Sequence, residues 1–158
     1  MKSIAMCSGK GGTGKSCAAT YIAEALARAG QKTLLVELGE DSRSLDLILG
    51  VTTTAFGVGD VLSGVCEIEE AISPVDRTPG LFLMPPGAEI PLNSEEIADL
   101  LRKLEKEYDY ILVDGARFQT LPVKALGLFL MVTTPDSLSV RACADLSRRL
   151  YGKGAKEI

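Results

Sequence analysis

The residues with the clearest chemical potential form a glycine-rich segment near the amino end of the chain, with two lysines and a serine. Residues 8–16 read Ser-Gly-Lys-Gly-Gly-Thr-Gly-Lys-Ser, which satisfies the spacing G-x-x-x-x-G-K-[ST]. Glycine permits backbone conformations closed to other residues, so several N–H groups of such a loop can converge on one cluster of negative oxygens. The spacing therefore predicts a binding loop for a nucleoside polyphosphate.

Within this loop, individual side chains have distinct expected roles. Lys15 is expected to reach the β- and γ-phosphates of ATP as a point charge, and the Ser16 hydroxyl to ligate Mg²⁺. The alternative is a glycine-rich turn that binds nothing, and the number of matched positions argues against it. The predicted nucleotide-binding residues are Gly9, Lys10, Gly11, Gly12, Thr13, Gly14, Lys15, Ser16 and Cys17.

A carboxylate that could complete the metal site closes an apolar run further along the chain. Residues 110–113 read Tyr-Ile-Leu-Val, and Asp114 follows them. A phosphate-loop NTPase needs a carboxylate near its Mg²⁺, and the alternative for an aspartate at this point is a helix N-cap or a turn. Because the chain also carries the phosphate loop, we interpret Ser16 and Asp114 together as the metal-binding residues.

The phosphate loop requires a strand before it and a helix after it, and the sequence predicts both. Residues 4–7 are a short apolar run typical of a buried strand, and residues 16–29 are alanine-rich up to Gly30, a residue that commonly ends helices. The positions expected to form the apolar face of this helix are Ala18, Tyr21, Ile22, Ala25, Leu26 and Ala29.

Strand-like and helix-like segments alternate over the rest of the chain. Strands that are apolar throughout and alternate with helices indicate a mostly parallel sheet flanked by helices on both faces, the three-layer α/β architecture of P-loop NTPases, here as one domain over residues 1–158. Ligands of such sheets lie beyond the carboxyl ends of the strands. The expected strands are residues 4–7, 33–36, 81–84, 110–113 and 128–132, and the expected helices are residues 16–29, 45–50, 59–64, 67–72, the segment after Asn93, and residues 137–150.

Composition excludes several classes of function. The net charge is −4 and the sequence has no long basic run, which argues against direct nucleic-acid binding. The absence of histidine excludes histidine-based catalysis and histidine metal sites. No apolar stretch approaches the roughly 20 residues of a membrane span. The four cysteines form no C-x-x-C pair, which favours reduced thiols in a cytosolic protein.

The phosphate loop also carries a second lysine, Lys10, which the general motif does not require. The segment G-K-G-G-x-G-K-S resembles the deviant phosphate loop of the MinD/ParA group of ATPases. Further stretches, RSLDLILG, VGDVLSG, LFLMPPGA, YDYILVD and VTTPDSLSVR, extend the resemblance over essentially the whole chain and favour the MinD branch.

The resemblance implies a cytosolic, Mg²⁺-dependent ATPase that forms a homodimer with ATP and regulates placement of the division septum. Its implied partners are a division inhibitor and a protein that stimulates hydrolysis. Lys10 would reach the partner subunit's phosphates and act as an arginine finger does, neutralising charge in the transition state. The implied catalytic residues are Lys10, Asp114 and Glu37.

The sequence departs from the family pattern at the second strand. Family members usually carry D-x-D there, and the second aspartate helps to position the attacking water. The aligned residues are Glu37 and Gly39, so only the first carboxylate is kept. Glu40 or Asp41 would replace the second only if the loop shifted.

Two further departures lie beyond the second strand. The family's D-x-P-A-G switch reads Asp114-Gly115-Ala116-Arg117-Phe118. The chain ends at Ile158, without the family's next strand and terminal membrane helix, so we expect weak adenine selectivity and no membrane docking by this chain alone; peripheral membrane association would need a longer form carrying that helix.

The departures define an alternative to an active switch. A degenerate relative would bind nucleotide and recruit a partner with little or no hydrolysis, and Gly39 and Arg117-Phe118 favour this version. A small phosphate-loop kinase is a third hypothesis, against which Lys10 and the RSLDLILG stretch argue.

Overall fold

The computed structural model describes residues 3–39, 44–52 and 54–158. Glu40 and Asp41, the possible substitutes for the missing aspartate, lie outside the described residues. Six strands form one sheet in the order β3-β4-β2-β5-β1-β6. The strands are β1 (Ser3–Cys7), β2 (Thr33–Glu37), β3 (Ser73–Pro74), β4 (Leu81–Met84), β5 (Tyr110–Asp114) and β6 (Leu128–Met131).

Neighbouring strands of the sheet pair in parallel, apart from the short edge strand β3, which runs antiparallel to β4. The parallel register places Glu37 of β2 directly beside Asp114 of β5. Every residue of β1 and β2 is buried, which agrees with the apolar runs that they contain, residues 4–7 and 34–36. The predicted mostly parallel sheet is confirmed, and both carboxylates lie at its carboxyl edge.

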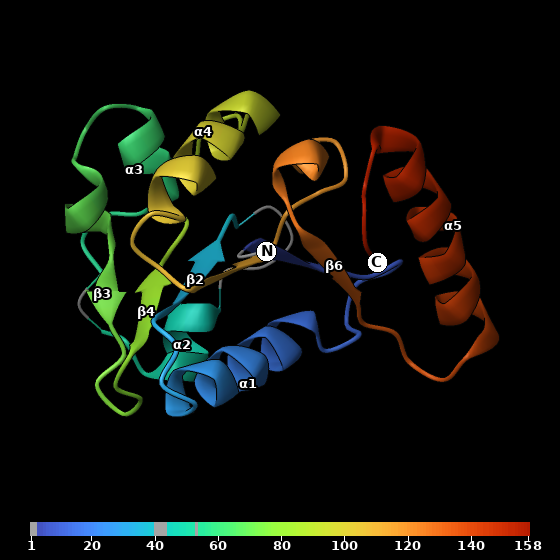
Figure 1. Cartoon of the computed structure of the whole chain (residues 1–158), viewed down its shortest axis with the longest axis horizontal. Helices are drawn as coiled ribbons and strands as arrows, with labels where there is room; N and C mark the ends of the chain where they lie inside the picture. Colours follow the sequence, from blue (N-terminus) through green and yellow to red (C-terminus); the bar gives the residue numbers. More distant parts are fainter. Residues whose placement is uncertain (1–2, 40–43, 53) are drawn as a thin grey trace.

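Helices cover both faces of the sheet, as Figure 1 shows, with α1 and α2 below it and α3 and α4 above it. Successive residues of a strand point to opposite faces, so Met6 belongs to the core under α1 and α2, whereas Ala5 belongs to the core under α4. The predicted three-layer architecture is therefore confirmed. The helices are α1 (Lys15–Arg28), α2 (Leu45–Leu49), α3 (Val58–Leu62), α4 (Ser94–Leu104) and α5 (Ser137–Lys153), with 3₁₀ turns η1 (Ile68–Ala71) and η2 (Val123–Ala125).

The buried face of α1 differs from the one that the apolar pattern predicts. Ala19, Thr20, Ala23 and Ala27 face the sheet, and Tyr21 is 73% exposed. Thr20 can be buried because its hydroxyl donates to the Ser16 carbonyl at 2.9 Å, so no polar group is left unsatisfied. The prediction of Tyr21, Ala25 and Ala29 as core residues was wrong, because small side chains let α1 lie close to the strands.

The last helix is longer than its sequence predicts. It passes through Gly152 and ends where Gly154 adopts a left-handed conformation, with φ of 99°. The following residues turn back along the edge strand β6, where the Phe129 N–H donates to the Glu157 carbonyl at 3.1 Å. Figure 1 shows α5 and the carboxyl end beside β6. Among the described residues, no helix is long and apolar enough to cross a membrane.

Candidate nucleotide-binding site

The glycine-rich loop connects the carboxyl end of β1 to the first turn of α1. Gly12 and Gly14 adopt positive φ angles of 74° and 89°, which side chains other than glycine disfavour. The helix begins at Lys15, and Ala18 N–H donates to the Gly14 carbonyl at 2.9 Å. The amino end of a 14-residue helix therefore faces the loop, an arrangement suited to binding anions.

Gly9 is required for a different reason, the close approach of α5. A Cβ atom on Gly9 would lie 2.4 Å from the carbonyl carbon of Ala142 and 2.5 Å from its Cβ. Both contacts are far shorter than van der Waals separation, so only glycine fits. The phosphate loop thus packs directly against α5, and the side chains of that helix border the site.

Ser16 and Asp114 meet below the loop, as expected for a metal site. The Ser16 hydroxyl donates to Asp114 Oδ2 at 2.6 Å, and Asp114 is fully buried. The other carboxylate oxygen, Oδ1, is buried without a hydrogen-bond partner among the described residues. A buried, unsatisfied carboxylate oxygen is costly unless a cation or water completes it. The pair fits Mg²⁺, which takes one or two protein oxygens with phosphate oxygens and waters.

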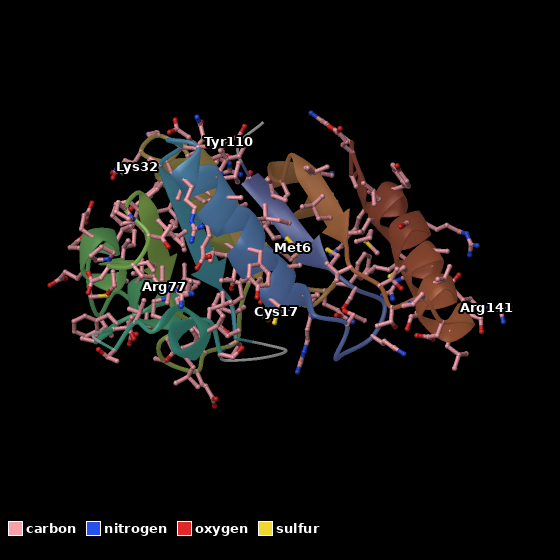
Figure 2. The ribbon with its side chains drawn as sticks, turned by 90° about the horizontal axis from the view of Figure 1, so that it is seen from below. Met6, Cys17, Lys32, Arg77, Tyr110 and Arg141 are labelled. Atoms are coloured by element: carbon pink, nitrogen blue, oxygen red, sulfur yellow. The ribbon has the colours of Figure 1, made fainter. Side chains whose placement is uncertain are left out.

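Two cysteines lie at the predicted site, and they differ in exposure. Burial raises the pKa of the Cys7 thiol to about 12, an effect that the Lys15 ammonium opposes and the Asp114 carboxylate reinforces. Cys7 is therefore a protonated core residue rather than a nucleophile. Cys17 is exposed at the amino end of α1. Figure 2 shows Cys17 at this end of the helix and Lys32 beyond the other end.

Lys10 lies in the loop and contacts the start of α5. Its Nζ donates to Asp136 Oδ2 at 3.3 Å, and both side chains are about half exposed. The pKa of Asp136 is lowered well below its usual range, mainly by hydrogen bonds from Ser139 and Thr134 and only in last place by Lys10. The Asp136 carboxylate is thus held by its own turn, and the lysine is a loosely attached addition.

Glu37 is buried at the end of β2, and its carboxylate holds the start of α2. Ser44 N–H donates to Glu37 Oε1 at 2.7 Å, and Leu45 N–H donates to both carboxylate oxygens at 3.3–3.4 Å. Burial raises the pKa of Glu37, and these two N–H groups oppose the shift. The observed contacts therefore give Glu37 a structural role, while its catalytic role stays a prediction.

We expect Glu37→Ala to lower the free energy of unfolding by about 1–3 kcal/mol, because it leaves buried N–H groups unsatisfied. Glu37→Gln keeps an acceptor oxygen and is expected to stay close to wild type. Since the folded-state pKa is raised, wild type should lose stability relative to Glu37→Gln as the pH rises from below 4.5 through that pKa. Urea unfolding of the three proteins at pH 4 and pH 7 measures both effects. If the wild-type protein gains stability relative to Glu37→Gln over this range, the raised pKa of Glu37 is contradicted.

A cavity of about 610 Å³ opens beside the loop, and Cys17 is not part of its lining. The phosphate loop forms one wall, the segment after Asp114 forms the second and α5 forms the third. Lysine and arginine side chains predominate among its charged residues. The lining includes Lys10, Lys15, Arg117, Phe118, Asp145 and Arg149.

The segment after Asp114 is fixed to α5 by Phe118. The Arg149 guanidinium carbon lies 4.1 Å from the centre of the Phe118 ring, and Lys153 Nζ lies 4.5 Å from it. Lys153 Nζ also donates to the carbonyl oxygens of Phe118 and Gln119, at 2.8 and 3.3 Å. Cation–π contacts and these hydrogen bonds hold a segment where the family pattern has a flexible proline–glycine switch.

Comparison with known proteins identifies the family. A family model described as an AAA domain matches residues 1–138. The putative septum site-determining protein MinD of Emiliania huxleyi is 32% identical over 98% of the chain. The chain belongs to the MinD/ParA-type ATPases. It spans 60% of the length of that relative.

Solved structures of the MinD/ParA-type family agree with the fold. The likeness to the MinC:MinD cell division complex of Aquifex aeolicus covers 99% of this chain and 67% of the matched chain of the complex, with 29% identity and a TM-score of 0.84. MinD of Pyrococcus horikoshii complexed with Mg-ADP matches the same shares at 24% identity and a TM-score of 0.84. The second likeness, at this identity, concerns the fold alone.

The structure brings the loop, Asp114 and Glu37 to one edge of the sheet, and it adds residues to which the sequence assigned no role. Asp136 lies 126 positions from Lys10, so no local spacing connects the two. Asp136 lies in the family-like stretch VTTPDSLSVR, after Pro135 and before a helix, a place that is typical of an N-cap. Arg149 and Lys153 carry no such signal.

Proposed function

We propose that this chain is a Mg²⁺-dependent ATP-binding switch of the MinD type, which forms a homodimer with ATP and regulates placement of the division septum. One observation carries the proposal: the Asp114 carboxylate accepts a hydrogen bond from Ser16 and keeps a buried second oxygen, below a loop that supplies Lys15. This set of groups matches the needs of a metal–triphosphate complex.

The residues of the loop and Asp114 each have a proposed part in binding. Lys15 and the N–H groups of the loop hold the β- and γ-phosphates, and Ser16 and Asp114 hold Mg²⁺, which neutralises phosphate charge when bound. Lys10 then acts on the nucleotide of the second subunit. The proposal of ATP and Mg²⁺ as cofactors rests on the geometry of Ser16 and Asp114 beside the loop; a protein of the same fold, MinD of Pyrococcus horikoshii, is complexed with Mg-ADP.

The relatives support a proposal for the partners of the chain and for its location in the cell. The MinC:MinD complex of Aquifex aeolicus supports a division inhibitor as partner, and a hydrolysis-stimulating protein would complete the cycle. We propose a cytoplasmic location for the domain.

A specific observation favours a second function, nucleotide-dependent recruitment with little hydrolysis. Gly39 offers no carboxylate to position water, and Phe118 is held against α5 by Arg149 and Lys153. Phosphoryl transfer depends on positioning of the attacking group. This version keeps ATP binding and dimerisation and removes turnover.

The two versions share one test, ATP-dependent dimerisation measured by light scattering. Mg²⁺-ATP is expected to shift the purified chain from the monomer mass to twice that mass, whereas Mg²⁺-ADP leaves the monomer. Lys15→Ala, which is expected not to bind, serves as control and should stay monomeric with either nucleotide. A wild-type chain that binds ATP and remains monomeric at every concentration would rule out the switch, and turnover by the ATP-bound dimer separates the active version from the recruiting one.

A further inference from the structure

The cavity beside the phosphate loop lies where the terminal phosphate of ATP is expected. Its second wall is the segment that directly follows Asp114, the proposed metal-side carboxylate, and Lys15 lines it. Cys17, on the other side of Ser16, lines a separate groove with Thr20 and Tyr21. In phosphate loops the lysine reaches the β- and γ-phosphates, so the cavity with Lys15 is on the γ-phosphate side.

One face of α5 forms the third wall of this cavity. Ala142, Asp145, Leu146 and Arg149 all line it, at the spacing that puts residues on one side of a helix. The position of this face is fixed, because the Ala142 backbone touches Gly9 of the phosphate loop. Arg149 therefore stands two turns along the helix from the loop itself and on the same side.

The guanidinium of Arg149 is well placed to bind an anion in the cavity. It is stacked on Phe118, with its carbon 4.1 Å from the ring centre, which restrains its orientation. Among the residues that the structure describes, no carboxylate pairs with it; Asp145 pairs instead with Arg148, whose side chain is largely exposed. A stacked guanidinium keeps its N–H donors free for oxygen ligands, and arginine suits phosphate because it presents paired donors.

We propose that Arg149 binds the terminal phosphate of ATP within its own subunit and so makes the site prefer ATP over ADP. This inference rests on the proposed nucleotide-binding function and adds a specificity-determining residue to it. Lys10 would add charge only when a second subunit arrives, whereas Arg149 is available in the monomer. The chain would therefore distinguish ATP from ADP before it dimerises.

The test compares affinities for Mg²⁺-ADP and for a non-hydrolysable Mg²⁺-ATP analogue by calorimetry, at concentrations where light scattering shows a monomer. Arg149→Gln is expected to weaken binding of the ATP analogue about tenfold or more, the size of a lost charge-assisted hydrogen bond, and to change ADP binding by less than about twofold. Arg149→Lys should keep most of the preference, because it keeps the charge. Arg141→Gln, which removes an exposed arginine of α5 that does not line the cavity, is the matched control and should change neither affinity.

The outcomes separate the inference from the proposed function. A wild-type chain that binds neither nucleotide overturns both. A wild-type chain that binds both, with Arg149→Gln losing affinity for the two nucleotides equally, overturns the Arg149 assignment alone, because an effect through Phe118 on the loop would not depend on the third phosphate. An unchanged ratio of the two affinities in Arg149→Gln has the same meaning.

Discussion

Replacing Lys15 with alanine is expected to abolish measurable binding of Mg²⁺-ATP and Mg²⁺-ADP. The ammonium group lies at the first residue of α1 and lines the cavity beside the loop, and its field already acts on the Cys7 thiol behind the loop. It adds a full charge to the partial charge of the helix end and the loop N–H groups. Loss of charge-assisted contacts to two phosphates should weaken binding by about a hundredfold or more.

Calorimetric titration of wild type and Lys15→Ala with each nucleotide checks this result. Lys106→Ala, which removes an exposed lysine beyond the end of α4, is the matched control and should bind as wild type does. Thermal unfolding without nucleotide should give the same midpoint for Lys15→Ala and Lys106→Ala. Undiminished, saturable binding by Lys15→Ala would show that the phosphate site lies elsewhere.

The fold and the centre of the site could be predicted because their signals are local. β4 has the bounds that its apolar run predicts, and the bounds of β1, β2, β5 and β6 differ by one residue. The phosphate loop concentrates several roles in nine consecutive residues, and its context of strand and helix is contiguous too. Asp114 could be found from the sequence for the same reason, because it ends an apolar strand.

Features that depend on packing between distant segments could not be predicted in this way. The buried face of α1 follows from how closely the helix approaches the sheet, so Tyr21 is exposed although it fits the apolar spacing. The short edge strand β3 was not predicted, and its Pro74 pairs with Phe82 at a position where the missing N–H costs little. The contacts of Asp136 with Lys10, and of Arg149 with Phe118, join segments far apart in the chain.

The role of Glu37 shows how one residue can satisfy two interpretations. Its position after the second strand predicts a carboxylate at the catalytic edge, and the register places it beside Asp114 as expected. Its oxygens are nevertheless occupied by the N–H groups of Ser44 and Leu45. A family pattern gives the residue type at a position, whereas the hydrogen bonds of this chain decide what the side chain does.

Replacing Lys10 with alanine is expected to spare nucleotide binding and to remove turnover that depends on dimerisation. Within the subunit, Lys10 contacts only the exposed carboxylate of Asp136 among the ion pairs of the described residues. Exposed pairs of this kind contribute little to stability, so the lysine can leave at little cost. Asp136 does not need it, because Ser139 and Thr134 already stabilise its charge.

A lysine held this loosely is available to a second subunit. If it neutralises transition-state charge there, its removal should lower turnover by about 10³-fold or more, in the range of arginine fingers supplied in trans. The measurement is specific activity with Mg²⁺-ATP as a function of protein concentration. Wild-type specific activity should rise with concentration as dimers form, and that of Lys10→Ala should stay flat and low, while both proteins bind ATP with similar affinity.

The comparison of Lys10→Ala with Lys15→Ala decides where the first lysine acts. Two lysines five residues apart in one loop could both serve the same nucleotide, and in that case both variants would lose binding together. A specific activity of the wild-type protein that does not change with its concentration would also indicate that Lys10 acts within its own subunit. If instead an ATP-bound wild-type dimer shows no turnover, Lys10 has no role in hydrolysis. Its contact with Asp136 would then be its remaining interaction. The concentration dependence of wild type is therefore measured first, because the meaning of the Lys10 variant depends on it.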